Sequence, residues 1–223
     1  MSELGPLTTS EVGPVEVLLV PLGATEQHGP HLPLDTDTRL ACELARRAAS
    51  RLGPGVLVAP ALPYGSSGEH AGFAGTLSIG QRALELVVVE LVRALGSEVG
   101  RTVLVNGHGG NAEPVARAVA RLRGEGRRVD AWFPHVEGAD AHAGWFETSL
   151  MLALDPEAVR VDRWARGDVR PLRDLIDELR SAGVRAVSAN GVLGNPASAS
   201  VERGEAMWQR LVDDLVAHVR QGA

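Results

Sequence analysis

The sequence predicts an α/β fold: one three-layer αβα domain, residues 1–223, built around a mostly parallel central sheet. Short, nearly continuous apolar runs alternate along the chain with longer segments of helical periodicity. Continuous apolar runs are typical of parallel strands that are buried on both faces. In addition, 223 residues with 44% hydrophobic and 22% charged side chains are the length and composition of one globular domain.

Four apolar runs are predicted to be strands: Val15–Pro21, Val56–Leu62, Arg101–Gly107 and Arg127–Phe133. Between and after these runs, apolar residues recur with the spacing of a helix face. This spacing predicts six helices, at Thr38–Arg51, Gly80–Leu95, Ala112–Arg123, Trp145–Leu154, Pro171–Ser181 and Val201–Arg220. Strands that alternate with helices form βαβ units, and these give a parallel sheet with helices on both faces.

Composition argues against several classes of partner. The net charge of −6 gives no electrostatic reason to expect nucleic acid or an anionic membrane. Cys42 is the single cysteine, so neither an intramolecular disulfide nor a thiolate zinc site is expected. No apolar run reaches about 18 residues and no signal-peptide pattern is present, so we expect a cytoplasmic protein without a membrane partner.

An unusual concentration of metal-ligand residue types follows the first predicted strand, in "TEQHGPHLPLDTD" (25–37). Glycine and proline exclude a continuous helix there. In an extended segment Glu26 and His28 project to the same side and can meet one point. Asp35 and Asp37 precede or begin a predicted helix, where capping is the alternative role. We expect one of the two to cap the helix and the other to bind a metal.

Two further strands are also followed by candidate ligands. His108 lies in "NGHGGN", and His142 and Glu147 lie in "HVEGADAHAGWFETS". Active sites of open parallel sheets form beyond the carboxyl ends of the strands, so the three segments should meet at one edge. The structural alternatives are a glycine-rich turn for His108 and a solvated helix face for Glu147. The apolar neighbours of Glu147 favour a half-buried carboxylate that needs a cation.

Three carboxylates and two imidazoles exceed what one catalytic zinc with an open position uses. The predicted ligands are Glu26, His28, Asp37, His108 and Glu147. They suit two divalent ions about 3.5–4 Å apart that share a carboxylate. Because the set has no thiolate, it does not discriminate among zinc, iron and manganese.

The chain resembles the creatininase family of metal-dependent amidohydrolases. The matching stretches are "PLGATEQHGPHLPLDTD", "GSSGEHAGFAGTLSIG", "VNGHGGN", "HAGWFETSLML" and "GVLGNPASAS". The resemblance implies a three-layer αβα fold, homo-oligomers that are often hexamers, and two metal ions per subunit. It implies that Glu26, Asp37 and His108 hold one ion, that His28, Asp37 and a further glutamate hold the other, and that His142 is catalytic.

One position departs from the family pattern. Members that hydrolyse creatinine carry a metal-binding glutamate two residues after the "NGH" histidine, whereas this chain has Gly110. We expect Glu147 to replace that ligand. The stretches "YGSSGEHAGFAGTLSIG", "RWARGDVRPL" and "AVSANGVLGNPASAS" are similar to a peptidase branch of the family. That branch implies a modified precursor peptide as the substrate, cleaved at its C-terminal Val–Tyr unit.

Two other functions remain open at this stage: a small-molecule amidohydrolase that cleaves a cyclic amide or a formamide, and a metal-storing oligomer subunit. A peptidase needs an open groove, and a lactam hydrolase a closed pocket. In either enzyme the two ions would activate a water, and His142 would donate a proton to the leaving amine. Substrate binding is considered for Glu69, His70 and Trp145, against the alternatives of loop anchoring for the first two and packing for Trp145.

Overall fold

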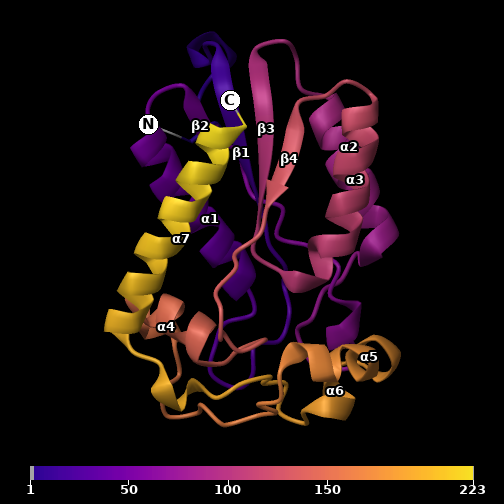
Figure 1. Cartoon of the computed structure of the whole chain (residues 1–223), viewed down its shortest axis with the longest axis vertical. Coiled ribbons are helices and arrows are strands. Elements are labelled where there is room, and N and C mark those ends of the chain that lie inside the picture. The colour runs from indigo at the N-terminus through magenta and orange to yellow at the C-terminus, as the bar shows by residue number, and fades with distance from the viewer. Residues whose placement is uncertain (1–2, 223) are drawn as a thin grey trace.

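The computed structural model describes residues 3–222 and contains one sheet of four parallel strands (Figure 1). The strands are β1 (Val15–Leu22), β2 (Val56–Val58), β3 (Val99–Asn106) and β4 (Val129–Trp132), in the spatial order β2-β1-β3-β4. Each neighbouring pair runs parallel, with Leu19 beside Val58 and beside Val103. The predicted parallel sheet is therefore confirmed.

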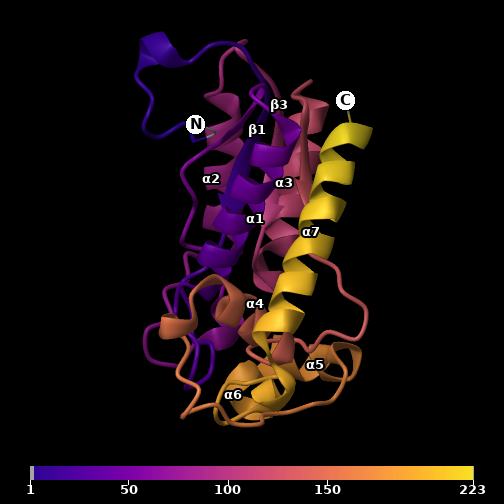
Figure 2. The same ribbon diagram turned by 90° about the vertical axis from the view of Figure 1, so that its left-hand side faces the viewer.

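Helices cover both faces of the sheet, which gives the three predicted layers (Figures 1 and 2). One face is covered by α1 (Thr36–Leu52) and α7 (Val201–Gln221), and the other by α2 (Gly80–Arg93) and α3 (Ala112–Gly124). The remaining helices are α4 (Trp145–Leu154), α5 (Leu172–Ala182) and α6 (Val184–Val187). None of the helices in residues 3–222 is long and apolar enough to cross a membrane.

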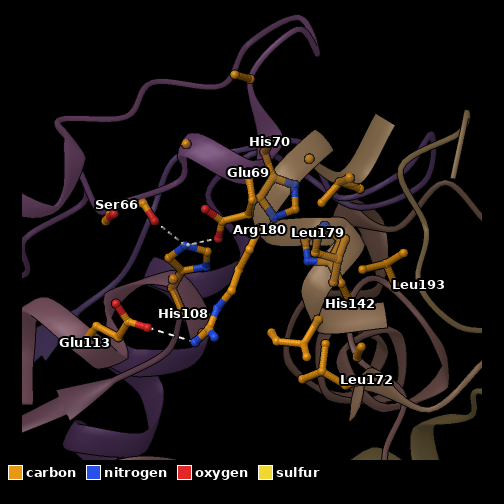
Figure 3. A pocket seen from close by; sticks show the side chains of 18 of the residues that line it. Ser66, Glu69, His70, His108, Glu113, His142, Leu172, Leu179, Arg180 and Leu193 are labelled. Atoms are coloured by element: carbon orange, nitrogen blue, oxygen red, sulfur yellow. Dashed lines mark hydrogen bonds and ion pairs between the residues drawn. The ribbon is translucent and has the colours of Figure 1, made fainter. Parts of the chain in front are cut away.

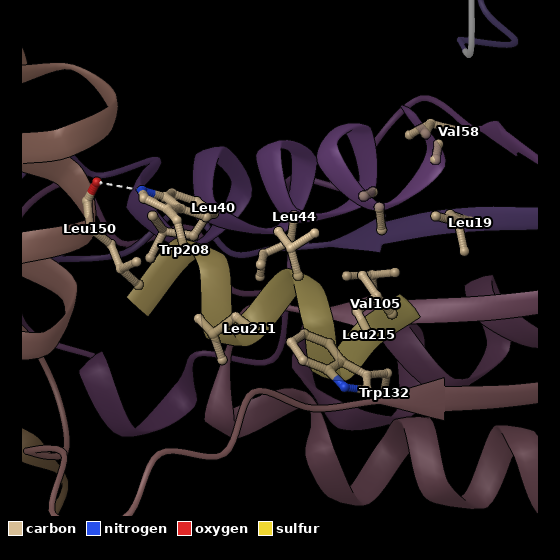
Figure 4. Close-up of a cluster of buried hydrophobic side chains, with 14 of the residues drawn as sticks. Leu19, Leu40, Leu44, Val58, Val105, Trp132, Leu150, Trp208, Leu211 and Leu215 are labelled. Carbon is tan, nitrogen blue, oxygen red and sulfur yellow. Dashed lines mark hydrogen bonds between the residues drawn. The ribbon is translucent and has the colours of Figure 1, made fainter. Parts of the chain in front are cut away.

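Alternation along the strands creates a separate apolar core on each face. In β1, Leu19 faces the core under α1 and α7, whereas Leu18 and Val20 face the core under α2 and α3. Trp208 of α7 is fully buried in the first core, and its indole N–H donates to the backbone oxygen of Leu150 at 3.1 Å (Figure 4). The continuous apolar character of the strands thus reflects burial on both sides.

The second strand is shorter than predicted. It ends at Val58, whereas the apolar run continues to Leu62. Pro60 has no N–H for a ladder and stops regular pairing. Only an isolated bridge between Leu22 and Leu62 continues the alignment. The residues released from the ladder begin a long loop that reaches α2.

The strand order places a crevice at the carboxyl ends of β1 and β3. From β1 the chain passes through α1 to β2 on one side, whereas from β3 it passes through α3 to β4 on the other side. Connections that leave in opposite directions and cover opposite faces leave a gap between two adjacent strands, where ligands bind in such sheets. The helices α4, α5 and α6 lie at this end of the sheet (Figure 1).

Candidate active site

Segments that follow β1, β3 and β4 meet in this crevice. The first carries Glu26, His28 and Asp37, the second His108, and the third His142, followed by Glu147 in the first turn of α4. All these side chains are buried except that of Glu147, which is 16% exposed. The structure therefore brings together every residue that the sequence predicted as a metal ligand or catalytic residue.

Glu26 lies at the centre of three imidazoles. Its Oε2 is 3.2 Å from Nε2 of His108, and its Oε1 is 3.2 Å from Nε2 of His70. Nδ1 of His142 lies 3.8 Å from the same Oε1. With no exposed surface, the Glu26 carboxylate can be neutralised only by these groups or by a cation bound among them.

Asp37 lies between the imidazoles of His28 and His108. Its Oδ1 is 3.0 Å from Nε2 of His28, and its Oδ2 is 3.2 Å from Nδ1 of His108. His108 therefore contacts Glu26 and Asp37 through different ring nitrogens. A Cβ at Gly107 would collide with the backbone oxygen of Asp37, so glycine at the end of β3 allows this close approach.

The alternative capping role falls to neither aspartate. Asp35 is at the N-cap position of α1, but its carboxylate accepts from Arg39 and makes no cap hydrogen bond. Asp37 is in the first helical turn and points into the site. The expected division into one cap and one site residue is thus wrong for Asp35, because the Arg39 guanidinium is a closer charged partner.

Glu147 is held by a strained piece of backbone. Its Oε2 accepts the N–H of Ala143 at 2.6 Å and lies 3.9 Å from Nε2 of His28. Ala143 has φ = +52°, a left-handed conformation that is unfavourable for a residue with a Cβ, and it is fully buried. Strain of this kind clusters at functional sites, where the surrounding structure enforces it.

The charges of the site are strongly coupled. Burial lowers the pKa of His28, but Asp37, Glu147 and Glu26 outweigh burial and raise it to about 10. Burial raises the pKa of Glu147 to about 7, although His28 opposes the change. The pKa of Asp37 is held well below its usual range by His28 and His108, despite burial. Burial and the neighbouring His28 lower the pKa of His142 well below its ordinary value.

The donor set fits divalent cations. Three carboxylate oxygens, both of Glu26 and Oδ2 of Asp37, are buried and make no hydrogen bond. Among residues 3–222, three sets of three side chains bring ligand atoms within 4.8 Å of one another: Glu26–His28–Asp37, His28–His142–Glu147 and Glu26–His70–His142. Nδ1 of His28 faces the backbone oxygen of Glu26 at 3.1 Å, and this contact directs Nε2 towards the carboxylates, as in metal-binding histidines.

Four of the predicted site residues, Asp37, His108, His142 and Glu147, line a cavity of about 690 Å³. Figure 3 shows His108 and His142 in this cavity. An aliphatic part of the cavity wall comes from α5, with Leu172, Ile176 and Leu179. At the rim, Nη2 of Arg180 lies 2.9 Å from Oε1 of Glu113, and both side chains are more than half exposed. The cavity is therefore open to solvent between α5 and α3.

Glu69 and His70 both line this cavity, from a short 3-10 helix (Gly68–His70) in the long loop after β2. Oε1 of Glu69 lies 3.4 Å from Nε2 of His108. At Gly110 a Cβ would collide with Oε1 of Glu69 and with the backbone oxygen of Ser66. Position 110 therefore has no room for a side chain, and the nearest carboxylate in that space belongs to Glu69.

Trp145 is not among the residues that line the cavity. Its backbone N–H donates to Asp140 at 2.6 Å, and the guanidinium of Arg203 covers its ring, 4.6 Å from the centroid. The structure thus gives no support to a substrate contact and places Trp145 in packing between α4 and α7.

Sequence reasoning missed one buried residue of the site. Gln27 is 5% exposed and contacts His70, His142 and the backbone of Gly191. Gln27 lies between Glu26 and His28 in the sequence, and an extended segment predicts a shared side only for those two neighbours. The aliphatic wall from α5 was also missed, because the stripe of leucines in this helix reads as ordinary core packing.

Fold and site together define a class of α/β proteins with a buried carboxylate–histidine cluster at the switch point of a parallel sheet. The family model described as "Creatininase: Creatinine amidohydrolase" matches residues 7–219. The chain belongs to the creatininase family.

Individual relatives match over nearly the whole chain. The chain is 46% identical to the mycofactocin precursor peptide peptidase of Mycobacterium ulcerans (strain Agy99), covering 98% of this chain and 91% of that protein. It is similar to a solved structure titled "Creatininase Mn", with TM-score 0.80, 30% identity, and coverage of 99% and 98%. A creatininase variant of "Zn-Zn type" gives TM-score 0.79 at 30% identity, with coverage of 99% and 97%.

Proposed function

We propose that this protein is a metal-dependent peptidase that cleaves the modified C-terminal Val–Tyr unit from the mycofactocin precursor peptide. The observation that carries the proposal is the buried cluster of carboxylates and imidazoles, of which Asp37, His108 and His142 line an open cavity. The identity of 46% to a peptidase of that name, over 98% of the chain, supports the choice of substrate.

We assign the metal ligands as the sequence predicted them. Glu26, Asp37 and His108 would hold one divalent ion, and His28, Asp37 and Glu147 the other. The unpartnered oxygens of Glu26 and Asp37 support this assignment. Zinc and manganese appear in the titles of related creatininases, and zinc, iron and manganese all suit the donors. When bound, the ions would lower the pKa of a water and polarise the scissile carbonyl.

His142 would transfer the proton in this reaction. Its lowered pKa keeps the imidazole neutral near pH 7, so it can accept a proton. Nδ1 lies 3.8 Å from Glu26, on the cluster side of the cavity. From there His142 would deliver the proton to the leaving amine of the cleaved amide bond.

The cavity walls suit a peptide end with a bulky apolar group. Leu172, Ile176 and Leu179 give the cavity an aliphatic surface, which would contact the modified side chains. Glu69 and His70 also line the cavity and would lie beside the substrate backbone. The solvent-exposed rim at Arg180 and Glu113 leaves room for the upstream chain of a peptide.

A small-molecule amidohydrolase remains the second candidate, because the family model is described as creatinine amidohydrolase. Two observations weigh against it. Identity is 32% to the creatinine amidohydrolase of Pseudomonas putida, compared with 46% to the peptidase. Gly110 also stands where creatinine-hydrolysing members carry a metal-binding glutamate.

Mass spectrometry of cleavage products tests the function. The metal-loaded protein is incubated with the modified precursor peptide, with the unmodified peptide, with creatinine and with a formamide. We expect release of the modified C-terminal unit and little turnover of the other three compounds. Hydrolysis of creatinine or the formamide with an intact precursor peptide would contradict the proposal.

We further propose a cytoplasmic homo-oligomer, such as a hexamer. The resemblance to creatininases supports the oligomer, and the single cysteine is consistent with a reducing compartment. Light scattering of the purified protein at several concentrations would measure the number of subunits.

A further inference from the structure

Gln27 joins four separate segments of the site. Its side chain contacts Gly29 in its own loop, His70 in the loop after β2, and Gly191 in the loop before α7. Its backbone oxygen contacts His142, which follows β4. Two of these partners have a fixed hydrogen-bonding sense, because the N–H of Gly29 can only donate and the backbone oxygen of Gly191 can only accept. They therefore determine where the hydrogen atoms of the other contacts lie.

The orientation of the Gln27 amide follows from its two backbone partners. Oε1 lies 2.9 Å from the backbone N–H of Gly29, which can only donate. Nε2 lies 3.0 Å from the backbone oxygen of Gly191, which can only accept. One of the two Nε2 hydrogens is thus used by Gly191. The other is directed to Nδ1 of His70, at 2.8 Å.

This assignment places the proton of a neutral His70. Because Nδ1 accepts from Gln27, the ring proton is on Nε2, which lies 3.2 Å from Oε1 of Glu26. A protonated Nε2 has no lone pair for a cation. His70 is therefore unable to act as a ligand in the set Glu26–His70–His142, although its geometry would allow it.

The backbone of Gln27 places the proton of His142 in the same way. Nε2 of His142 lies 2.8 Å from the backbone oxygen of Gln27 and must donate to it. Nε2 of Gln27 and Nε2 of His142 lie 3.0 Å apart. Because both nitrogens are then donors, this contact is not a hydrogen bond. The lone pair of His142 is left on Nδ1, which faces Glu26 at 3.8 Å.

We propose that Gln27 is a positioning residue of the active site. Its side-chain amide holds His70 with the proton on Nε2, beside Glu26 and outside the metal ligands. Its backbone carbonyl holds His142 with the Nδ1 lone pair towards the reacting groups. The catalytic part of this inference rests on the proposed hydrolase function, whereas the placement of protons does not.

Nitrogen NMR of the imidazole rings tests the proton placement without metal or peptide. In protein labelled with ¹⁵N-histidine, we expect a bare Nδ1 and a protonated Nε2 for both His70 and His142. In Gln27→Glu the new carboxylate faces Nδ1 of His70, so that nitrogen should become protonated. His142 should not change, because its partner is the backbone. A protonated Nδ1 of His70 in the wild type would overturn the proposal, as would an unprotonated one in Gln27→Glu.

Kinetics of Gln27→Leu test the functional part. This variant removes every side-chain hydrogen bond at similar volume, and we expect kcat to fall about 10- to 100-fold with KM nearly unchanged. Gln209→Leu, on the exposed face of α7, is the matched control and should be unchanged. A folded Gln27→Leu variant with wild-type kcat would contradict the proposal. If the wild type cleaves no peptide, the proposed function fails, and the NMR result still decides the proton placement.

Discussion

At the scale of single residues, the site is organised around negative charge that the protein does not neutralise by hydrogen bonds. Glu26 and Asp37 are buried, yet three of their four carboxylate oxygens make no hydrogen bond and are only approached by imidazole nitrogens at 3.2 Å. Burying unpaired carboxylates is costly, and proteins keep such groups where a cation or a reaction uses them. In the absence of metal, protons on His28 and His108 offset this charge, and both imidazoles have raised pKa values.

Replacement of His142 by alanine separates its catalytic role from metal binding. We expect His142→Ala to retain its metal but to lose about 10²- to 10⁴-fold in turnover, the usual contribution of a general acid or base. Metal analysis and a peptide cleavage assay measure the two quantities.

His135→Ala is the matched control, because His135 lies in the same segment but is exposed. It should keep both metal and turnover. A metal-free His142→Ala protein would show instead that His142 is a ligand.

Replacement of Glu147 tests the assignment of the second ion. Glu147→Gln keeps an oxygen for the N–H of Ala143 but removes the charge. We therefore expect the folded variant to lose one of two bound metal equivalents, as measured by elemental analysis after dialysis. Glu137→Gln, at an exposed position, should bind as the wild type does. Two bound metal equivalents in Glu147→Gln would contradict the assignment of Glu147 as the ligand in place of the glutamate missing at position 110. Glu69 would then be the next candidate.

At the scale of elements, α1 and α7 pack together on one face of the sheet, and α1 carries Asp37 in its first turn. Leu44 is 2% exposed in the core between these helices, whereas Leu86 of α2 is 55% exposed. We expect Leu44→Ala to lower the free energy of unfolding by about 2–5 kcal/mol, because it removes buried contacts and leaves a cavity. Leu86→Ala should change it by about 0.5 kcal/mol or less. Urea denaturation of both variants measures the difference, and equal losses would contradict the assigned core.

The end of α7 is bound to the sheet through the half-buried carboxylate of Asp130. Asp130 of β4 accepts from Arg101 at 2.8 Å and from His218 of α7 at 2.5 Å. Burial of Asp130 raises its pKa, but these bonds outweigh burial and hold the pKa below its ordinary value of 3.8. The stabilisation by the ionised group is therefore present above that value and is lost as pH falls through the folded-state pKa.

Replacement of Asp130 should show this pH dependence. At pH 7, Asp130→Asn should lose about 3 kcal/mol of unfolding free energy, because it leaves the Arg101 charge without its counterion. The difference from the wild type should shrink as pH falls through the folded-state pKa of Asp130. Denaturation curves from pH 7 to pH 2.5 measure it, and a constant difference would contradict the assignment.

Local patterns predicted most elements because each pattern has a direct local cause. Continuous apolar runs predicted four parallel strands, and helical spacing placed α1, α2, α3, α4, α5 and α7. The predicted β2 was too long, because the apolar run includes Pro60, which has no N–H to pair with a neighbouring strand. The turn α6 was not predicted, since four residues carry too little periodicity to register.

At the scale of the whole molecule, the strand order explains why distant segments form one site. The rule for carboxyl ends of parallel strands was enough to group Glu26, His108 and His142. It was not enough to find Gln27 or the wall from α5, because their roles depend on contacts between loops, which no local pattern encodes. It also did not specify that the loop after β2 would place Glu69 in the space left by Gly110.

The most direct test of the central claim is anomalous diffraction from crystals of the metal-loaded protein, recorded at the absorption edge of the bound metal. We predict two peaks per subunit about 3.5–4 Å apart, with Asp37 between them, Glu26 and His108 on one, and His28 and Glu147 on the other. An active, metal-replete protein without anomalous peaks at these residues would contradict the account.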